Sequence, residues 1–152
     1  MRARVLALAI ILGFAIAVAA GLYYNKQEQA EVSEATIYLT PECGCCGAYA
    51  SYLESQGYKV EKIVVSQGEL YSLMEVAPRR LWSCHLVEMN GYYVIGHVPV
   101  EAIDKLLENK PDVDGIALPG MPPGSPGMPG EQARPFTIYY FKGDEIGVFS
   151  QV

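Results

Sequence analysis

Residues 36–57 read TIYLTPECGCCGAYASYLESQG, and this stretch decides the fold. Its first four residues are β-branched, aromatic and aliphatic, which predicts a buried strand that Thr40-Pro41 ends. Residues 48–56 carry helix formers with Tyr49, Tyr52 and Leu53 at helical spacing, so they predict a helix that stops at Gly57. Residues 58–65 predict a second strand through Val60, Ile63, Val64 and Val65. A strand–loop–helix–strand unit of this kind places its two strands parallel.

The same patterns predict the elements that follow. They are a short helix at 67–76, a hairpin of 83–89 and 92–97 around Asn90-Gly91, a helix at 100–108, a Gly/Pro/Met loop at 116–131 and a second hairpin of 136–141 and 146–151. The order β-α-β-α-β-β-α predicts an α/β fold. We expect a thioredoxin/glutaredoxin-like mixed sheet with helices and an added C-terminal β-hairpin.

The N-terminal 24 residues differ in composition from the rest of the chain. Arg2 and Arg4 precede an unbroken apolar run at 5–24, which is typical of a signal peptide or an N-terminal membrane anchor. Ala17-Val18-Ala19 fits a cleavage site, whereas the run also reaches the roughly 20 residues that span a bilayer. Both interpretations place the domain outside the cytoplasm, in the periplasm or on the outer face of the cell membrane.

The sequence therefore divides into residues 1–24, a polar tether at 25–35 and a folded domain at 36–152. The formal net charge is −6, and the first 24 residues contribute only their two arginines, so the domain is more acidic than the whole chain. A negative surface argues against nucleic acid as a partner. We find no nucleotide-binding loop, no paired catalytic acids and no serine triad.

The cysteines carry the strongest chemical signal. Cys43 and Cys46 form a C-x-x-C at the start of a predicted helix, where the helix N-terminus lowers the pKa of a thiol. Cys45 lies between them and would compete in every step of disulfide exchange. Three thiolates within four residues are instead a concentrated soft-donor site, which favours Cu(I), zinc or an iron–sulfur cluster.

Further donors are expected beside this loop. In a fold of this order the loop after the first strand faces the start of the third, which would bring Cys84 and His85 close, with His97 at the end of the facing strand. Strand alternation separates Cys84 from His85, so both bind one site only if the strand begins with a twist or bulge. Met121 and Met128 are auxiliary candidates, because thioethers select Cu(I).

Several alternatives stay open. His85 and His97 are also interpretable as core histidines, and the two methionines as core residues. The four cysteines are compatible with a zinc site or with two structural disulfides. A thiol–disulfide oxidoreductase using Cys43 and Cys46 is a further alternative, although Ser83-Cys84-His85 has no proline where thioredoxins place a cis-proline.

Four motifs occur in a defined order and together resemble a known family. They are Thr40-Pro41-Glu42-Cys43-Gly44-Cys45-Cys46-Gly47, Ser83-Cys84-His85, Gly96-His97-Val98-Pro99 and the segment PGMPPGSPGM at 119–128. They resemble a bacterial domain-of-unknown-function family of metal-binding proteins that includes the CopG-like exported proteins of copper-resistance operons. The resemblance spans about residues 36–152. One departure is Tyr49, because the family often has tryptophan three residues after the last loop cysteine.

The resemblance implies a thioredoxin-like fold that binds several copper ions, with a redox role in copper handling. It implies Cys43, Cys45, Cys46 and Cys84 as ligands, with His85 and His97 nearby. We therefore expect an exported protein of copper resistance that holds Cu(I), with zinc less expected, in a site of more than one ion. We expect its partners to be copper ions, other copper-handling proteins and, through the N-terminal segment, the membrane. Any enzymatic activity would be that of a copper or thiol oxidoreductase.

Overall fold

A computed structural model describes residues 16–18 and 34–152 of the chain. The chain divides into two units, Met1–Val32 and Ser33–Val152, and residues 16–18 in the first unit are helical. Apart from residues 16–18, the predicted signal peptide or anchor lies outside the described residues, as does most of the predicted tether. Within the described part of the chain, no helix combines the length and the apolar character needed to cross a bilayer.

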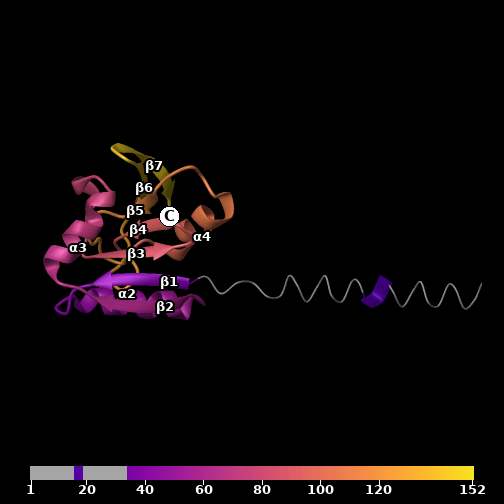
Figure 1. The fold of residues 1–152 in the computed structure, drawn as a ribbon, viewed down its shortest axis with the longest axis horizontal. Coiled ribbons are helices and arrows are strands. Elements are labelled where there is room, and N and C mark those ends of the chain that lie inside the picture. Colours follow the sequence, from indigo (N-terminus) through magenta and orange to yellow (C-terminus); the bar gives the residue numbers. More distant parts are fainter. Residues whose placement is uncertain (1–15, 19–33) are drawn as a thin grey trace, which may run out of the picture. The chain divides into compact units, whose positions relative to one another are not determined.

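The second unit is a mixed α/β structure, as predicted. Its elements are β1 (Glu34–Leu39), α2 (Gly44–Ser55), β2 (Lys59–Val64), α3 (Gln67–Leu73), β3 (His85–Met89), β4 (Tyr92–Ile95), α4 (Val100–Asn109), β5 (Gly115–Ala117), β6 (Thr137–Lys142) and β7 (Glu145–Gln151). They form one seven-stranded sheet in the order β2-β1-β3-β4-β5-β6-β7 (Figure 1). β1 and β2 are parallel, whereas β3–β4 and β6–β7 are antiparallel hairpins.

Several boundaries differ from the sequence predictions, and three of them bear on the site. The first strand begins at Glu34 and not at residue 36, and α2 begins at Gly44 and not at residue 48, so Cys45 and Cys46 lie in its first turn. The loop predicted at 116–131 is wrong at its start, because Gly115–Ala117 is strand β5. Three buried residues are too short a stretch to show strand periodicity, and pairing with β4 and β6 decides their structure.

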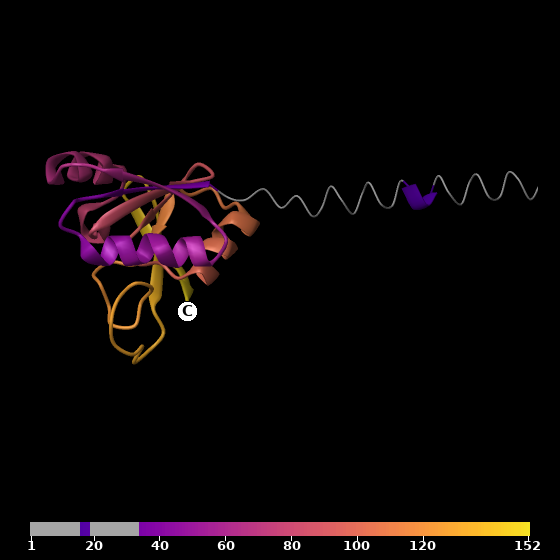
Figure 2. The ribbon, with the colours of Figure 1, turned by 90° about the horizontal axis from the view of Figure 1, so that it is seen from below.

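Helices cover both faces of the sheet. On one face α2 and α4 pack through fully buried side chains that include Tyr49, Leu53, Ile103 and Leu106. On the other face α3 and the turn after it pack against the sheet through Leu70 and Met74. Figure 2 shows α2 and the orange loop between β5 and β6 on one side of the sheet, with α3 on the opposite side. The Cys45 sulfur at the start of α2 lies 4.0 Å from the sulfur of Met121 in this loop.

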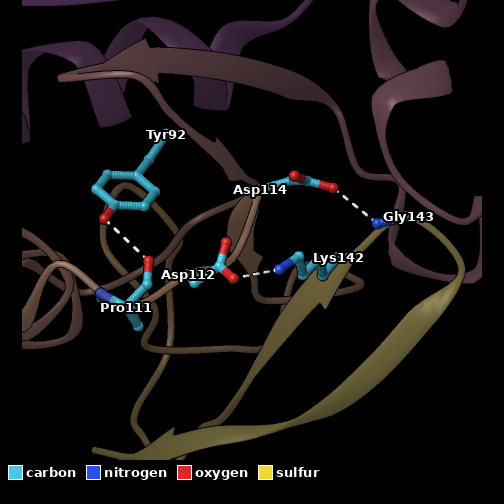
Figure 3. A network of polar contacts seen from close by, with 6 residues as sticks. All are labelled: Tyr92, Pro111, Asp112, Asp114, Lys142 and Gly143. Atoms are coloured by element: carbon cyan, nitrogen blue, oxygen red, sulfur yellow. Dashed lines mark hydrogen bonds and ion pairs between the residues drawn. The ribbon is translucent and has the colours of Figure 1, made fainter.

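A polar network ties the C-terminal hairpin to the segment before β5 (Figure 3). The Asp114 carboxylate accepts a hydrogen bond from the Gly143 N–H (2.7 Å), and Lys142 forms an ion pair with Asp112. The Tyr92 hydroxyl donates to the Pro111 carbonyl at 3.1 Å. The ion pair is exposed and contributes little stability. Backbone pairing sets the register of β5 and β6, and the network holds the hairpin beside the segment before β5. These two strands flank the loop that lies beside the thiols.

The sheet leaves no room for a side chain at Gly115. A Cβ there would lie 2.0 Å from the Tyr93 carbonyl oxygen and 2.7 Å from the Phe141 ring. We expect Gly115→Ala to lower the free energy of unfolding by about 1–3 kcal/mol, the usual cost of overpacking. Gly68 in α3 is the matched control, because nothing lies within 4 Å of its added Cβ. Denaturant unfolding should leave Gly68→Ala unchanged or more stable, and equal losses would contradict the interpretation.

Candidate metal centre

The cysteines meet because β1 and β3 pair side by side. The antiparallel register places Leu39, the last residue of β1, opposite His85, the first residue of β3. After Leu39 the chain makes a tight turn in which the Cys43 N–H donates to the Thr40 carbonyl at 3.1 Å. Cys43 then caps the start of α2. The turn and the helix start therefore lie beside Cys84, the residue before β3.

The four sulfur atoms form one cluster. The Sγ atoms of Cys43, Cys45, Cys46 and Cys84 all lie within 4.8 Å of one another. The Cys45 sulfur is 3.6 Å from that of Cys43 and 3.9 Å from that of Cys84. The proximity of the two cysteine segments predicted from the order of elements is thus present in the structure.

Two of these cysteines are joined. Cys43 and Cys46 form a disulfide with their Cα atoms 5.4 Å apart, a usual separation for such a bond. Cys45 and Cys84 are free cysteines. The disulfide lies at the N-terminus of α2, where the helix favours thiolates after reduction. All four sulfurs are available as ligands only in the reduced protein.

The histidines form a second group that shares Cys84 with the first. The Cys84 sulfur lies 3.4 Å from Nδ1 of His85 and 3.3 Å from Nε2 of His97. Alternation along a strand was expected to separate Cys84 from His85. Cys84 precedes the first residue of β3, so the regular alternation does not apply to it, and both side chains reach the same place.

Backbone carbonyls fix the tautomer of each imidazole. Nε2 of His85 lies 3.1 Å from the Gly96 oxygen, and Nδ1 of His97 lies 2.6 Å from the Pro126 oxygen. A carbonyl oxygen only accepts, so each of these nitrogens carries the hydrogen. The lone pairs of the other two nitrogens therefore converge on the Cys84 sulfur. This outer hydrogen bond is the arrangement by which proteins orient metal-ligating histidines.

Burial keeps these groups neutral. Both imidazoles are fully buried, and burial followed by the charge of His97 lowers the pKa of His85 to about 3. Burial also lowers the pKa of His97. Burial and the nearby Cys45 raise the pKa of the Cys84 thiol to about 11. A bound cation reverses the preference of the thiol, so metal binding at Cys84 releases a proton.

Tyr49 supports both histidines from α2. Its ring stacks on His85 with centroids 4.6 Å apart and meets His97 edge-on at 5.3 Å. Its hydroxyl donates to the Val98 carbonyl at 2.8 Å. The sequence marked Tyr49 as part of a helical pattern and as a departure from the family pattern, and the structure places it behind the two imidazoles.

The two candidate methionines differ in their distance from the thiols. The Met121 sulfur lies 4.0 Å from the Cys45 sulfur, on the exposed side of the thiols. Met128 donates its backbone N–H to Ser125 at 2.8 Å, and no contact of its sulfur with a cysteine is recorded among residues 34–152. The carbonyls of Gly96 and Pro126 are site groups that sequence reasoning missed. Their only sequence signal was the Gly/Pro content of both segments.

The donor set fits soft metal ions. A tetrahedral ion with metal–sulfur bonds of about 2.3 Å holds two thiolates about 3.8 Å apart. The distances from the Cys45 sulfur to its two neighbours, 3.6 and 3.9 Å, agree with this value. Thiolate and neutral imidazole suit Cu(I) and zinc. The two donor groups share Cys84 and together offer six donors, more than one tetrahedral ion uses.

Known proteins match this chain in sequence and in fold. A family model described as "Protein of unknown function, DUF411" matches residues 81–128, which contain Cys84 and both histidines. Two solved structures, titled copper resistance protein CopG form 1 and form 2, are each 31% identical to the chain with a TM-score of 0.71. They cover 80% of this chain, which in turn covers 98% and 99% of theirs. No curated protein matches.

The lowered pKa of His85 predicts a pH-dependent stability for the metal-free protein. An unfolded His85 takes up a proton below about pH 6.5, whereas the folded one stays neutral to about pH 3. The contribution of neutral His85 to the free energy of unfolding is therefore fully present above pH 6.5. It is lost as the pH falls toward 3, by about 1.4 kcal/mol per pH unit. Urea unfolding at several pH values should give a shallower slope for His85→Gln. An equal pH dependence of stability in the wild type and in His85→Gln would contradict the lowered pKa of His85.

The disulfide predicts that metal capacity depends on reduction. Oxidised protein offers Cys45, Cys84 and the two histidines, whereas reduced protein adds two thiolates. We expect anaerobic titration with Cu(I) to give a higher stoichiometry for protein pretreated with a phosphine reductant. Thiol counting before each titration is the control. Identical stoichiometry at two and at four free thiols would show that Cys43 and Cys46 are not ligands.

Proposed function

Because the chain belongs to the CopG-like family of copper resistance proteins, we propose that it is an exported protein that binds Cu(I) as its cargo. Cys43, Cys45, Cys46 and Cys84 supply the thiolates, and His85 and His97 supply two neutral imidazoles. The convergence of both histidine lone pairs on the Cys84 sulfur carries the proposal. The single S–H of Cys84 can donate to only one of these two nitrogens, so the other buried lone pair lacks a donor until a cation binds.

The donor set favours copper over zinc. A structural zinc ion is closed by four ligands, whereas two donor groups that share Cys84 offer six donors here. A thioether, the Met121 sulfur, lies beside the thiols, and thioethers select Cu(I). Cys84 belongs to both donor groups, which suits a sulfur shared between ions. We therefore propose a site of several Cu(I) ions, in which the buried imidazoles and Tyr49 exclude water from the inner side.

The proposed leader at residues 1–24 would direct export of the protein. Outside the cytoplasm the protein would meet conditions in which thiols oxidise. Bound copper would protect the thiols there. The membrane is a proposed partner only through this segment, and other copper-handling proteins are the proposed donors or acceptors of the cargo. A change between Cu(I) and Cu(II) at the site would make the protein a copper oxidoreductase.

A second candidate function rests on the Cys43–Cys46 disulfide at the start of α2. This is the position of a redox dithiol, and it supports a thiol–disulfide oxidoreductase. The two functions differ in their dependence on Cys45. A dithiol enzyme would reduce insulin without metal and would be insensitive to Cys45→Ser, whereas a copper protein needs the Cys45 sulfur.

Copper stoichiometry tests the proposal. Reduced protein is loaded anaerobically with Cu(I), and separately with Zn(II), and the metal is measured after treatment with a chelator that removes zinc. We expect several copper ions per chain to remain, and Cys45→Ser to lose most of them. Ser51→Ala, an exposed change on the same helix, is the matched control. Unchanged copper stoichiometry in Cys45→Ser would contradict the proposal.

A further inference from the structure

The soft donors of this protein form a row that leads from the surface to the interior. Met121 is 49% exposed, Cys45 and Cys84 are half-buried, and both histidines are 0% exposed. The sulfur of Met121 lies 4.0 Å from that of Cys45, which lies 3.9 Å from that of Cys84. Cys84 in turn lies 3.3 Å from the Nε2 atom of His97. Each step is short enough for one ion to contact both donors at once.

The outer end of this row opens on a groove of about 410 Å³. Its lining includes Met121, Cys43 and Cys84, and its far wall holds Trp82 stacked on Tyr71 at 5.6 Å. The two histidines do not line it. A copper carrier in solution therefore meets sulfur first and reaches the imidazoles only through Cys84.

The backbone holds Met121 at this position. The Ser83 hydroxyl donates to the Gly120 carbonyl at 3.1 Å, and Gly120 has a φ of 79°, which glycine adopts without strain. Pro122 follows Met121 directly and restricts its backbone. The chain thus fixes the Cα of Met121 beside the thiols, with its sulfur against Cys45 and about half of the residue exposed to solvent. A methionine that served only to fill the core would have been buried.

We propose that Met121 is the surface acceptor for Cu(I), which passes it to Cys45 and so to the buried centre; this inference rests on the proposed function. The transfer is a ligand exchange without redox change. Each step forms one copper–sulfur bond as another breaks, and the partly exposed Cys45 thiol releases its proton to solvent. A thioether suits this role because it binds Cu(I), carries no proton and forms no disulfide. Met121 then sets the rate of exchange and not the amount bound.

Loading kinetics test this role. Reduced full-length chain in detergent is mixed anaerobically with the coloured Cu(I)–bicinchoninate complex, and the loss of colour is followed by stopped flow. We expect Met121→Leu to slow loading by about tenfold, roughly 1.4 kcal/mol in activation free energy, with unchanged final stoichiometry. Since the equilibrium is unchanged, removal of copper by excess chelator should slow by the same factor. Met128→Leu, in the same loop, should load and unload at the wild-type rates.

Each other result overturns the proposal. Wild-type rates in Met121→Leu would show that copper enters by another path. A loss of stoichiometry or affinity would make Met121 a resident ligand and not an acceptor. If the wild-type protein retains no copper, the proposed function fails together with this inference. If the wild-type protein retains copper and Met121→Leu loads at the wild-type rate, only the acceptor role of Met121 is overturned.

Discussion

The antiparallel pairing of β1 with β3 is the constraint on which the centre depends. It sets Leu39 opposite His85, so the turn after β1 meets the residue before β3. Cys45 and Cys84 are 39 positions apart in the chain, and only this register brings their sulfurs together. A slip of one residue would turn every side chain of β3 to the other face and remove Val87 from the core. The packing of the sheet therefore enforces the geometry of the donors.

Such a centre has to be stable before any metal arrives. Buried polar groups without partners destabilise a fold, and a buried charge does so more strongly. The protein meets this requirement with neutral groups: both imidazoles donate to backbone carbonyls, and the raised pKa of Cys84 keeps its thiol protonated. The same hydrogen bonds leave one lone pair free on each ring. The metal-free state is thus already arranged for binding.

Much of this was predictable from sequence, for identifiable reasons. Residues 36–57 have strong strand and helix periodicity, and Asn90-Gly91 adopts the positive φ values that its hairpin requires. The grouping of the four cysteines followed from the order of elements. Strand β5 was missed because tertiary pairing and not local pattern forms it. The different positions of Met121 and Met128 depend on the path of a long loop, which no periodicity encodes.

That loop connects the interior of the centre to its surface. The Pro126 carbonyl orients His97, and five residues earlier the same loop presents Met121 to Cys45. The loop reaches so far inward because Gly127 packs against α2, where an added Cβ would lie 2.8 Å from the Tyr49 nitrogen. A larger residue at Gly127 would lift the loop, and the carbonyl and the thioether would leave together. Gly127 is therefore needed for the centre alongside the cysteines, because the close approach of its backbone to α2 determines where the donors of the loop lie.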